Sequence, residues 1–142
     1  MGHEFLDGES VLAFDLETTG ISTNTDRIVQ IALIGSNSTG DTVHYETLVN
    51  PRRPIPPGAS GVHGIFDSDV KGEQDFRHHA DEIHRLIENS VVVGHNIRKF
   101  DMPLLENEFS RIGRLPPKPK AMMDTLEIVR RVKLGRPHNL GS

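Results

Sequence analysis

The sequence predicts a mixed α/β sheet, in which a three-strand antiparallel meander is joined by parallel strands and flanked by helices. Two observations lead to this prediction. Three strand-like segments come first, at residues 11–16, 28–34 and 42–49, and turn-forming residues separate the last two. Helical segments then alternate with short apolar segments, a pattern typical of strands that run parallel to one another.

The first three segments differ in composition. Val11–Leu16 is apolar except for one acidic residue, and it leads into Thr18–Asp26, which we expect to be a loop. Ile28–Ile34 is rich in β-branched residues and almost continuously apolar, so it predicts a buried strand. Thr42–Val49 alternates in polarity, as a strand with one solvent-facing side does.

The segment Asn50–Gly64 contains four prolines. Proline lacks a backbone N–H group and clashes with the preceding turn of a helix. It also cannot donate a hydrogen bond to a neighbouring strand. We therefore expect neither a regular helix nor a central strand in this segment.

The second half of the sequence alternates between helix and strand. Apolar residues at helical spacing predict helices over 75–89 and 99–112, and Pro103 fits only in the first turn of the latter. The apolar run Val91–Val93 predicts a short buried strand between them. A last strand is expected at residues 121–123, followed by a helix at 125–132.

Composition indicates a single soluble domain. The 142 residues suffice for one hydrophobic core, with residues 1–10 expected to be a flexible lead-in and residues 11–142 the domain. The absence of cysteine excludes disulfides, thiolate zinc sites and thiol catalysis. No apolar stretch approaches the roughly 18 residues that span a bilayer, so we expect no membrane partner and a cytoplasmic location.

Charge is unevenly distributed along the chain. The net charge is −4, yet residues 111–142 hold eight Lys and Arg against two Asp and Glu. This basic end could face the phosphates of a nucleic acid, or it could be a solvated helix face. Both interpretations remain open at this point. The residues concerned are Arg111, Arg114, Lys118, Lys120, Arg130, Arg131, Lys133 and Arg136.

Two carboxylates lie close together in the first strand. Because side chains alternate across a strand, Asp15 and Glu17 point to the same face. Their repulsion and lost hydration are costly unless a cation or a proton lies between them. The strand is followed by Thr18, Thr19 and Gly20, a turn whose hydroxyl and N–H groups we expect to be free for a ligand. The pattern predicts a divalent-metal site.

A third carboxylate is predicted at the same site. Asp101 follows the Val91–Val93 strand and lies near the start of a helix. If that strand lies beside the first, Asp101 can face Asp15 and Glu17. Three hard oxygen donors suit Mg²⁺ or Mn²⁺. Two such ions about 4 Å apart would polarise a phosphodiester and activate water.

Four segments together resemble a known enzyme family. Phe14–Gly20 looks like the first motif of the DEDD (DnaQ-like) 3′–5′ exonucleases, and His95–Asp101 resembles the second. Val62–Ile65 resembles the segment between these motifs, and Asp124–Leu126 resembles a later landmark. The order of the segments also matches that of the family. The resemblance implies an RNase H-like fold.

The resemblance also implies an activity. Members remove nucleotides from a 3′ end by two-metal hydrolysis, so the implied partner is the 3′ end of single-stranded DNA or RNA. A DNA polymerase is a further implied partner if the domain proofreads. The implied catalytic metal ligands are Asp15, Glu17 and Asp101. The implied substrate-binding residues are Thr18, Thr19, Gly20, His63 and Asn96.

One family feature is missing from the sequence. Members carry a third motif, a His or Tyr followed by an Asp, and its expected position falls beyond Ser142. His138–Ser142 instead resembles the helix start that precedes this motif. We therefore expect a domain incomplete at its C-terminus. The alternative is a catalytically incomplete module that binds nucleic acid or a protein, and a weaker alternative is a phosphatase acting on small nucleotides.

Overall fold

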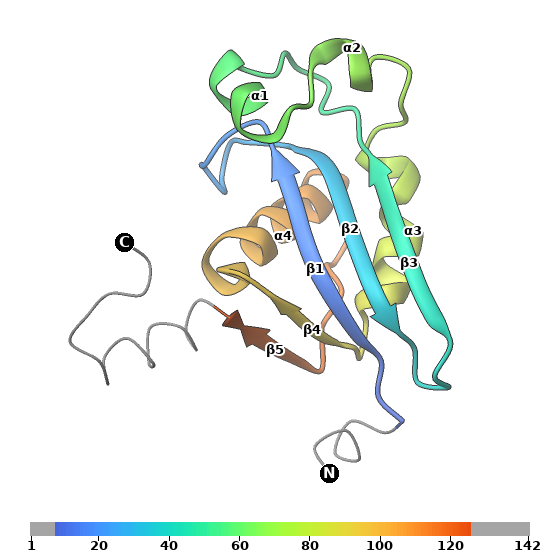
Figure 1. Ribbon diagram of the computed structural model, residues 1–142. Helices are drawn as coiled ribbons and strands as arrows, with labels where there is room; N and C mark the ends of the chain where they lie inside the picture. Colours follow the sequence, from blue (N-terminus) through green and yellow to red (C-terminus); the bar gives the residue numbers. More distant parts are fainter. Residues whose placement is uncertain (1–7, 126–142) are drawn as a thin grey trace, which may run out of the picture.

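The computed structural model describes residues 8–125, which form one five-stranded sheet with helices around it (Figure 1). The strands lie in the order β3-β2-β1-β4-β5. Their bounds are Val11–Thr18 for β1, Ile28–Ser36 for β2, Thr42–Leu48 for β3, Val91–Gly94 for β4 and Ala121–Asp124 for β5. All five lie where the sequence predicts strands, and β1 and β2 each extend two residues further.

The pairing of the strands confirms the predicted mixed sheet. β1 pairs antiparallel with β2, and β2 pairs antiparallel with β3, so the first three strands form the meander. β4 lies parallel to β1, and β5 lies parallel to β4. The central position of β1 brings the segment after β4 next to the acidic residues of β1.

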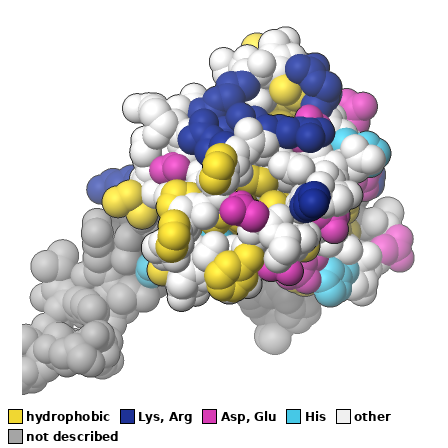
Figure 2. Space-filling view, turned by 90° about the horizontal axis from the view of Figure 1, so that it is seen from above, with side chains coloured by type: hydrophobic (Ala, Val, Ile, Leu, Met, Phe, Trp, Pro, Cys, Tyr) yellow, Lys and Arg dark blue, Asp and Glu magenta, His cyan; other side chains and the backbone are white. Residues whose placement is uncertain are grey.

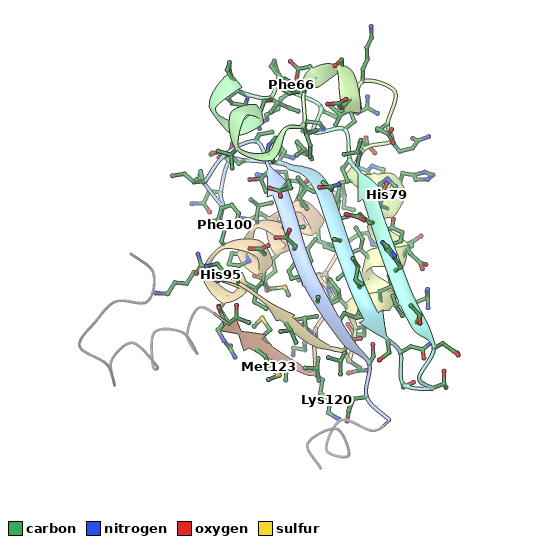
Figure 3. The ribbon with its side chains drawn as sticks, viewed as in Figure 1. Phe66, His79, His95, Phe100, Lys120 and Met123 are labelled. Carbon is green, nitrogen blue, oxygen red and sulfur yellow. The ribbon has the colours of Figure 1, made fainter. Side chains whose placement is uncertain are left out.

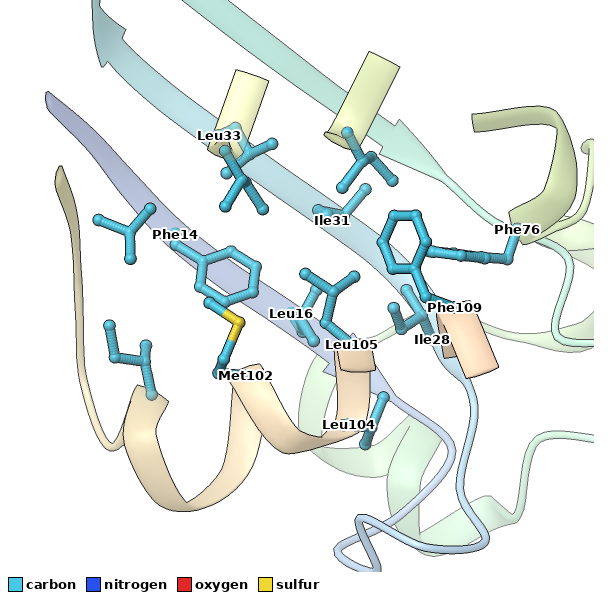
Figure 4. Packing of buried hydrophobic residues seen from close by; sticks show 14 of the residues in the cluster. Phe14, Leu16, Ile28, Ile31, Leu33, Phe76, Met102, Leu104, Leu105 and Phe109 are labelled. Carbon is cyan, nitrogen blue, oxygen red and sulfur yellow. The ribbon is translucent and has the colours of Figure 1, made fainter. Parts of the chain in front are cut away.

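The core lies between one face of the sheet and two helices, α3 (Phe76–Ile87) and α4 (Met102–Arg111) (Figures 1 and 4). Alternate residues of β1 point into this layer, and burial of each large side chain contributes about 1.5–3 kcal/mol. The buried members of β1 and β2 include Leu12, Phe14, Leu16, Ile31 and Leu33, and those of the helices include Phe76, Ile83, Met102, Leu105 and Phe109.

The expectation that Asn50–Gly64 contains no regular helix is wrong. It contains the whole of α1, which spans Pro57–His63. Pro57 is the first helical residue, where a missing N–H group costs nothing. Gly64 ends the helix in the left-handed conformation, with a φ of 74°. The short helix α2 (Asp67–Val70) follows.

A small apolar cluster attaches α1 and α2 to the end of the sheet at which β1 finishes. It consists of Val29, Ile55, Ile65 and Val70. Figure 1 shows both helices above this end of the sheet. The proline-rich segment is therefore positioned directly beside the Thr-Thr-Gly turn.

The helix predicted over 99–112 is divided in two. A π-helix, η2 (Ile97–Asp101), precedes α4, and Pro103 lies in the first turn of α4 as predicted. The helix expected at 125–132, His138, and most of the lead-in at 1–10 lie outside the described residues. Within the lead-in, the Ser10 carbonyl accepts a hydrogen bond from the Val91 amide at 2.7 Å. None of the helices described between residues 8 and 125 is long and apolar enough to cross a membrane.

Candidate active site

Strand β1 sends Asp15 and Glu17 to the face opposite the helical core. Leu12, Phe14 and Leu16 are buried beneath the sheet, whereas Asp15 is exposed and Glu17 is half-buried. The predicted common face is therefore correct. The register with β2 shifts between Glu17 and Thr18, so a bulge lies immediately after the second carboxylate. Bulges of this kind turn the strand and change the direction of the next side chains.

Asp101 reaches β1 through the backbone. Its Oδ2 atom accepts a hydrogen bond from the Leu16 amide at 3.0 Å, and the side chain is almost wholly buried. β4 pairs with β1 only as far as Ala13 opposite Val93. Beyond that point, the Asp101 carboxylate accepts the hydrogen bond of the Leu16 amide in place of a backbone carbonyl of a longer β4. The third acid is thus held at the residue between Asp15 and Glu17.

The π-helical turn brings Asp101 to this position. Asn96, the residue just before η2, has a left-handed backbone, with a φ of 59°. Short π-helical stretches are frequent at functional sites because the wider turn redirects a side chain. Asp101 ends η2 and directly precedes α4. Its placement next to the first strand confirms the spatial relationship expected from the sequence.

Burial raises the pKa values of all three carboxylates, and neighbouring negative charge adds to the shift at Asp101 and Glu17. Burial raises the pKa of Asp101 to about 7; the Leu16 amide opposes this shift, and the charges of Asp15 and Glu17 add to it. Burial also raises the pKa of Asp15, against a backbone hydrogen bond from Leu16. The pKa of Glu17 is raised by burial and by Asp15, while a positive charge on His63 lowers it. A cation at this point would relieve the repulsion.

The donor set fits a divalent cation, although the side chains are not yet gathered around one. Among residues 8–125, no three His, Asp or Glu side chains converge closely enough to hold an ion. Asp101 is fixed by Leu16, but Asp15 is exposed and Glu17 half-buried, so both can rotate toward it. Carboxylate oxygens are the ligands that Mg²⁺ and Mn²⁺ prefer.

His63 connects α1 to the end of β1. Its Nε2 atom lies 3.0 Å from the Thr18 carbonyl oxygen, and its Nδ1 atom accepts a hydrogen bond from the Ile65 amide at 3.1 Å. A carbonyl can only accept and an amide can only donate, so the proton of the neutral ring lies on Nε2. Both ring nitrogens are therefore occupied within the protein. The direct contribution of His63 here is to hold α1 against the site.

The hydroxyls of the Thr-Thr-Gly turn are not free, contrary to expectation. The Thr18 hydroxyl donates to the Gly20 carbonyl at 2.6 Å. The Thr19 hydroxyl donates to Asp26 at 2.7 Å and accepts a hydrogen bond from the Arg27 amide at 3.0 Å. Both threonines are buried. They close the loop between β1 and β2, an arrangement that short-range sequence patterns do not reveal.

A largely apolar pocket of about 450 Å³ lies beside the carboxylates. Glu17 and His63 form its polar part. Ile21 and Val62 are strongly exposed at its border, and Phe100 lies on the η2 side of β1 (Figure 3). The other lining residues are Leu16, Thr18, Thr19, Gly20, Pro56, Gly58 and Ala59. The predicted substrate residues Thr18, Thr19, Gly20 and His63 thus share one pocket; Asn96 does not line it.

Asn96 instead belongs to a loop held by Asp124. The buried Asp124 carboxylate accepts hydrogen bonds from the amides of Asn96, at 2.8 Å, and Arg98, at 3.2 Å. It thereby fixes the start of η2, which ends in Asp101. The sequence marked Asp124 as a family landmark but gave no sign of this supporting role.

Sequence reasoning also missed Glu108. This side chain is 1% exposed, and it accepts hydrogen bonds from the Arg27 guanidinium at 3.1 Å and the Ile28 amide at 2.9 Å. It joins α4 to the loop that follows the acidic motif. A signal was present: Glu108 follows Leu104 by four residues and precedes Phe109, so it lies beside the apolar stripe of the helix.

Comparison with known proteins identifies the family. The model of the RNase_T family, described as exonuclease, matches residues 12–141. The chain belongs to the DEDD 3′–5′ exonuclease family. It is 34% identical over 104 residues to the DNA polymerase III subunit epsilon of Treponema pallidum, covering 73% of this chain and 48% of that protein. It is 34% identical over 116 residues to the 3′-5′ exonuclease DinG of Staphylococcus epidermidis, covering 80% of this chain and 12% of that protein.

A solved structure supports the fold of this exonuclease-family chain. E. coli Exonuclease I in complex with a dT13 oligonucleotide superposes with a TM-score of 0.77 and 23% identity, over 94% of this chain and 31% of that one. The RNase H-like fold expected from the sequence is therefore confirmed. The chain spans less than half the length of the relatives described above. Exonucleases of this type depend on divalent metal ions.

Proposed function

We propose that this chain is a 3′–5′ exonuclease domain that removes nucleotides from the 3′ end of a DNA or RNA strand. The observation that carries the proposal is the hydrogen bond from the Leu16 amide to Asp101. It attaches a third, buried carboxylate to the residue between Asp15 and Glu17. Membership of the exonuclease family supports a catalytic role for this acidic cluster.

In the proposed reaction, Asp15, Glu17 and Asp101 hold the divalent ions, either Mg²⁺ or Mn²⁺. Two bound ions would supply an activated water and neutralise the charge that develops on the phosphate. Asp101 contributes a fixed position, because its Oδ2 atom is held by the Leu16 amide. Asp15, which is exposed, and Glu17, which is half-buried, would supply the other carboxylate ligands.

The neighbouring pocket is proposed to receive the terminal nucleotide. Its apolar border, formed by Ile21, Val62 and Phe100, suits the face of a base. Glu17 lies at the same pocket and so connects the bound nucleotide with the acidic cluster. Thr18, Thr19 and Gly20 would form the wall against which the nucleotide packs, since the threonine hydroxyls are engaged within the loop. His63 would support this wall, and Asn96 would act from the adjoining loop.

The sequence also favours a second candidate. No match to the third family motif, which supplies a further acid and a general base, occurs among the 142 residues. A chain without these groups would serve as a module that binds nucleic acid or a protein partner. A role in proofreading for a DNA polymerase, or in independent trimming of DNA or RNA, would require the exonuclease and not the binding module.

The test is release of mononucleotides from 5′-labelled single-stranded DNA and RNA, with Mn²⁺, Mg²⁺ or EDTA. Shortening of the labelled strand from the 3′ end that requires a divalent ion, and that Asp15→Asn abolishes, supports the exonuclease. Glu106→Gln is a matched control, since Glu106 is exposed on α4. Intact oligonucleotide with both metals, together with retained oligonucleotide binding, would favour the binding module.

A further inference from the structure

Three arginines from distant parts of the chain meet around the loop between β1 and β2. Arg27 lies just before β2, Arg53 belongs to the proline-rich segment, and Arg111 ends α4. Burial lowers the pKa of Arg111, Glu108 opposes this shift, and the charges of Arg27 and Arg53 lower the pKa further. Figure 2 shows Lys and Arg side chains gathered over part of the end of the molecule seen from above. We call these three residues the arginine cluster.

The arginine cluster has more positive charge than its bonded carboxylate neutralises. Glu108 is buried and forms a salt bridge with Arg27 at 3.0 Å, while Arg111 is 3.8 Å from the same oxygen. Asp26, in the same loop, is turned toward the Thr19 hydroxyl and the Ser22 amide. Within residues 8–125, two positive charges of the cluster therefore remain without a directly hydrogen-bonded carboxylate. Such an excess attracts a polyanion.

The loop backbone fixes the guanidinium groups in place. Arg53 donates from Nη1 to the Thr25 carbonyl at 2.7 Å, and Arg111 donates from Nη2 to the Asn24 carbonyl at 2.7 Å. A guanidinium has five N–H donors, so each of these arginines has donors left for another acceptor. Preorganised guanidinium groups suit phosphate oxygens because two N–H groups can bind one phosphate.

The same loop lines the pocket on its other side. Gly20 and Ile21 belong to the pocket, and the Thr19 amide donates to the Arg27 carbonyl at 2.9 Å. The arginine cluster is thus separated from the pocket by the width of one loop. A strand whose 3′ nucleotide occupies the pocket meets the arginine cluster if it leaves across this loop.

We infer that the arginine cluster binds the phosphodiester backbone of the strand that leads to the 3′ end. The inference rests on the proposed function for the direction of the strand, but the binding itself needs neither a metal nor hydrolysis. Arg53 and Arg111 make the main phosphate contacts, whereas Arg27 is mostly occupied by Glu108. The cluster determines affinity for a long strand and not for a single nucleotide.

The test is anisotropy of a fluorescent single-stranded oligothymidylate bound to the whole chain in EDTA, between about 50 mM and 200 mM salt. The variants are Arg53→Gln/Arg111→Gln and the charge-preserving Arg53→Lys/Arg111→Lys. Arg85→Gln is the control, because Arg85 is an exposed residue of α3 paired with Glu82. Thermal unfolding of each variant shows whether removal of the bonds to the loop carbonyls has unfolded the domain.

The double Gln variant should bind on the order of tenfold more weakly at the lowest salt, and its salt slope should be shallower by about 0.7 for each phosphate that is no longer bound. The double Lys variant should retain the wild-type slope, and Arg85→Gln should bind as wild type does. Equal affinity and slope for the double Gln variant and Arg85→Gln would overturn the inference, as would failure of the wild type to bind.

A hydrolysis measurement separates this inference from the proposed function. Cleavage by the wild type, with unaltered binding in the double Gln variant, would support the exonuclease activity. It would also show that the arginine cluster does not bind the strand. Arginine-dependent binding without metal-dependent cleavage would support phosphate binding by the arginine cluster and would contradict the proposed exonuclease activity.

Discussion

The Oδ2 atom of Asp101 accepts a hydrogen bond from the Leu16 amide at 3.0 Å, across 85 positions of sequence. The pairing of β4 with β1 ends at Ala13, so at Leu16 this contact takes the place of a hydrogen bond between strands. It also places a buried carboxylate beside two others, at a cost in repulsion. A cation bound between these carboxylates would relieve the repulsion, so the arrangement fits a metal site.

Replacing Asp101 separates its structural and chemical contributions. Asp101→Ala leaves the Leu16 amide buried without an acceptor and should cost about 1–3 kcal/mol in the free energy of unfolding. Asp101→Asn retains an acceptor oxygen, so its cost should be smaller. Urea unfolding near neutral pH measures both values. If the Ala variant is as stable as the Asn variant, the Leu16 contact is not structural.

The metal-free protein should lose stability as the pH rises. The pKa of Asp101 is about 7 in the folded protein and 3.8 when unperturbed. Between these values the folded state holds a proton that the unfolded state has released, so stability falls with increasing pH. The loss is at most about 4 kcal/mol across this range. Unfolding from about pH 4 to about pH 8 should show it. Asp101→Asn should flatten the dependence of stability on pH. An unchanged dependence would show that the Asp101 carboxyl is not its source.

Glu108 should be among the most sensitive acidic residues in the described chain. Glu108→Ala removes the partner of a largely buried Arg27 and leaves the Ile28 amide unsatisfied, at a cost of about 3–5 kcal/mol. The control is Glu106→Ala on the same helix, where the side chain is exposed. Chemical denaturation should therefore distinguish the two sharply. Similar midpoints for both variants would show that Glu108 is not needed to anchor the loop.

Two glycines should respond to alanine in opposite ways. A Cβ atom at Gly94 would lie 2.5 Å from the Phe14 carbonyl oxygen, so Gly94→Ala has to push β4 away from β1. We expect a loss of about 1–3 kcal/mol. At Gly58, in α1, a Cβ atom meets no atom of the described chain within 4 Å, so Gly58→Ala should stabilise by about 0.4–1 kcal/mol. Thermal unfolding of the pair checks both signs, and a neutral Gly94→Ala would show that the strands can separate freely.

The periodic features of this fold could be predicted from sequence alone. An apolar run located β1, the period-two alternation of a strand placed Asp15 and Glu17 on one face, and a β-branched run located β2. The position of Asp101 followed from the rule that ligands gather at the ends of neighbouring strands. The strand and face predictions succeed because they depend on local geometry, whereas the Asp101 prediction also required β4 to lie beside β1.

Other features depend on contacts that no local pattern contains. The engagement of Thr19 by Asp26 arises only when the loop closes, and Asp124 supports Asn96 from a strand 28 positions away. The helix α1 was missed because four prolines suggested irregular structure, although Pro57 occupies the one helical position that tolerates it. Similarly, the arginine cluster joins residues that are far apart in sequence.

Calorimetric titration of Mn²⁺ into the wild type and Asp101→Asn, with Glu106→Gln as control, tests the central claim most directly. We expect the wild type and the control to bind the ion with release of protons near neutral pH, because metal binding competes with the raised pKa of Asp101. Asp101→Asn should bind at least about tenfold more weakly and release fewer protons. Binding of equal strength in Asp101→Asn, or no binding by the wild type, would contradict the assignment of Asp15, Glu17 and Asp101 as one metal site.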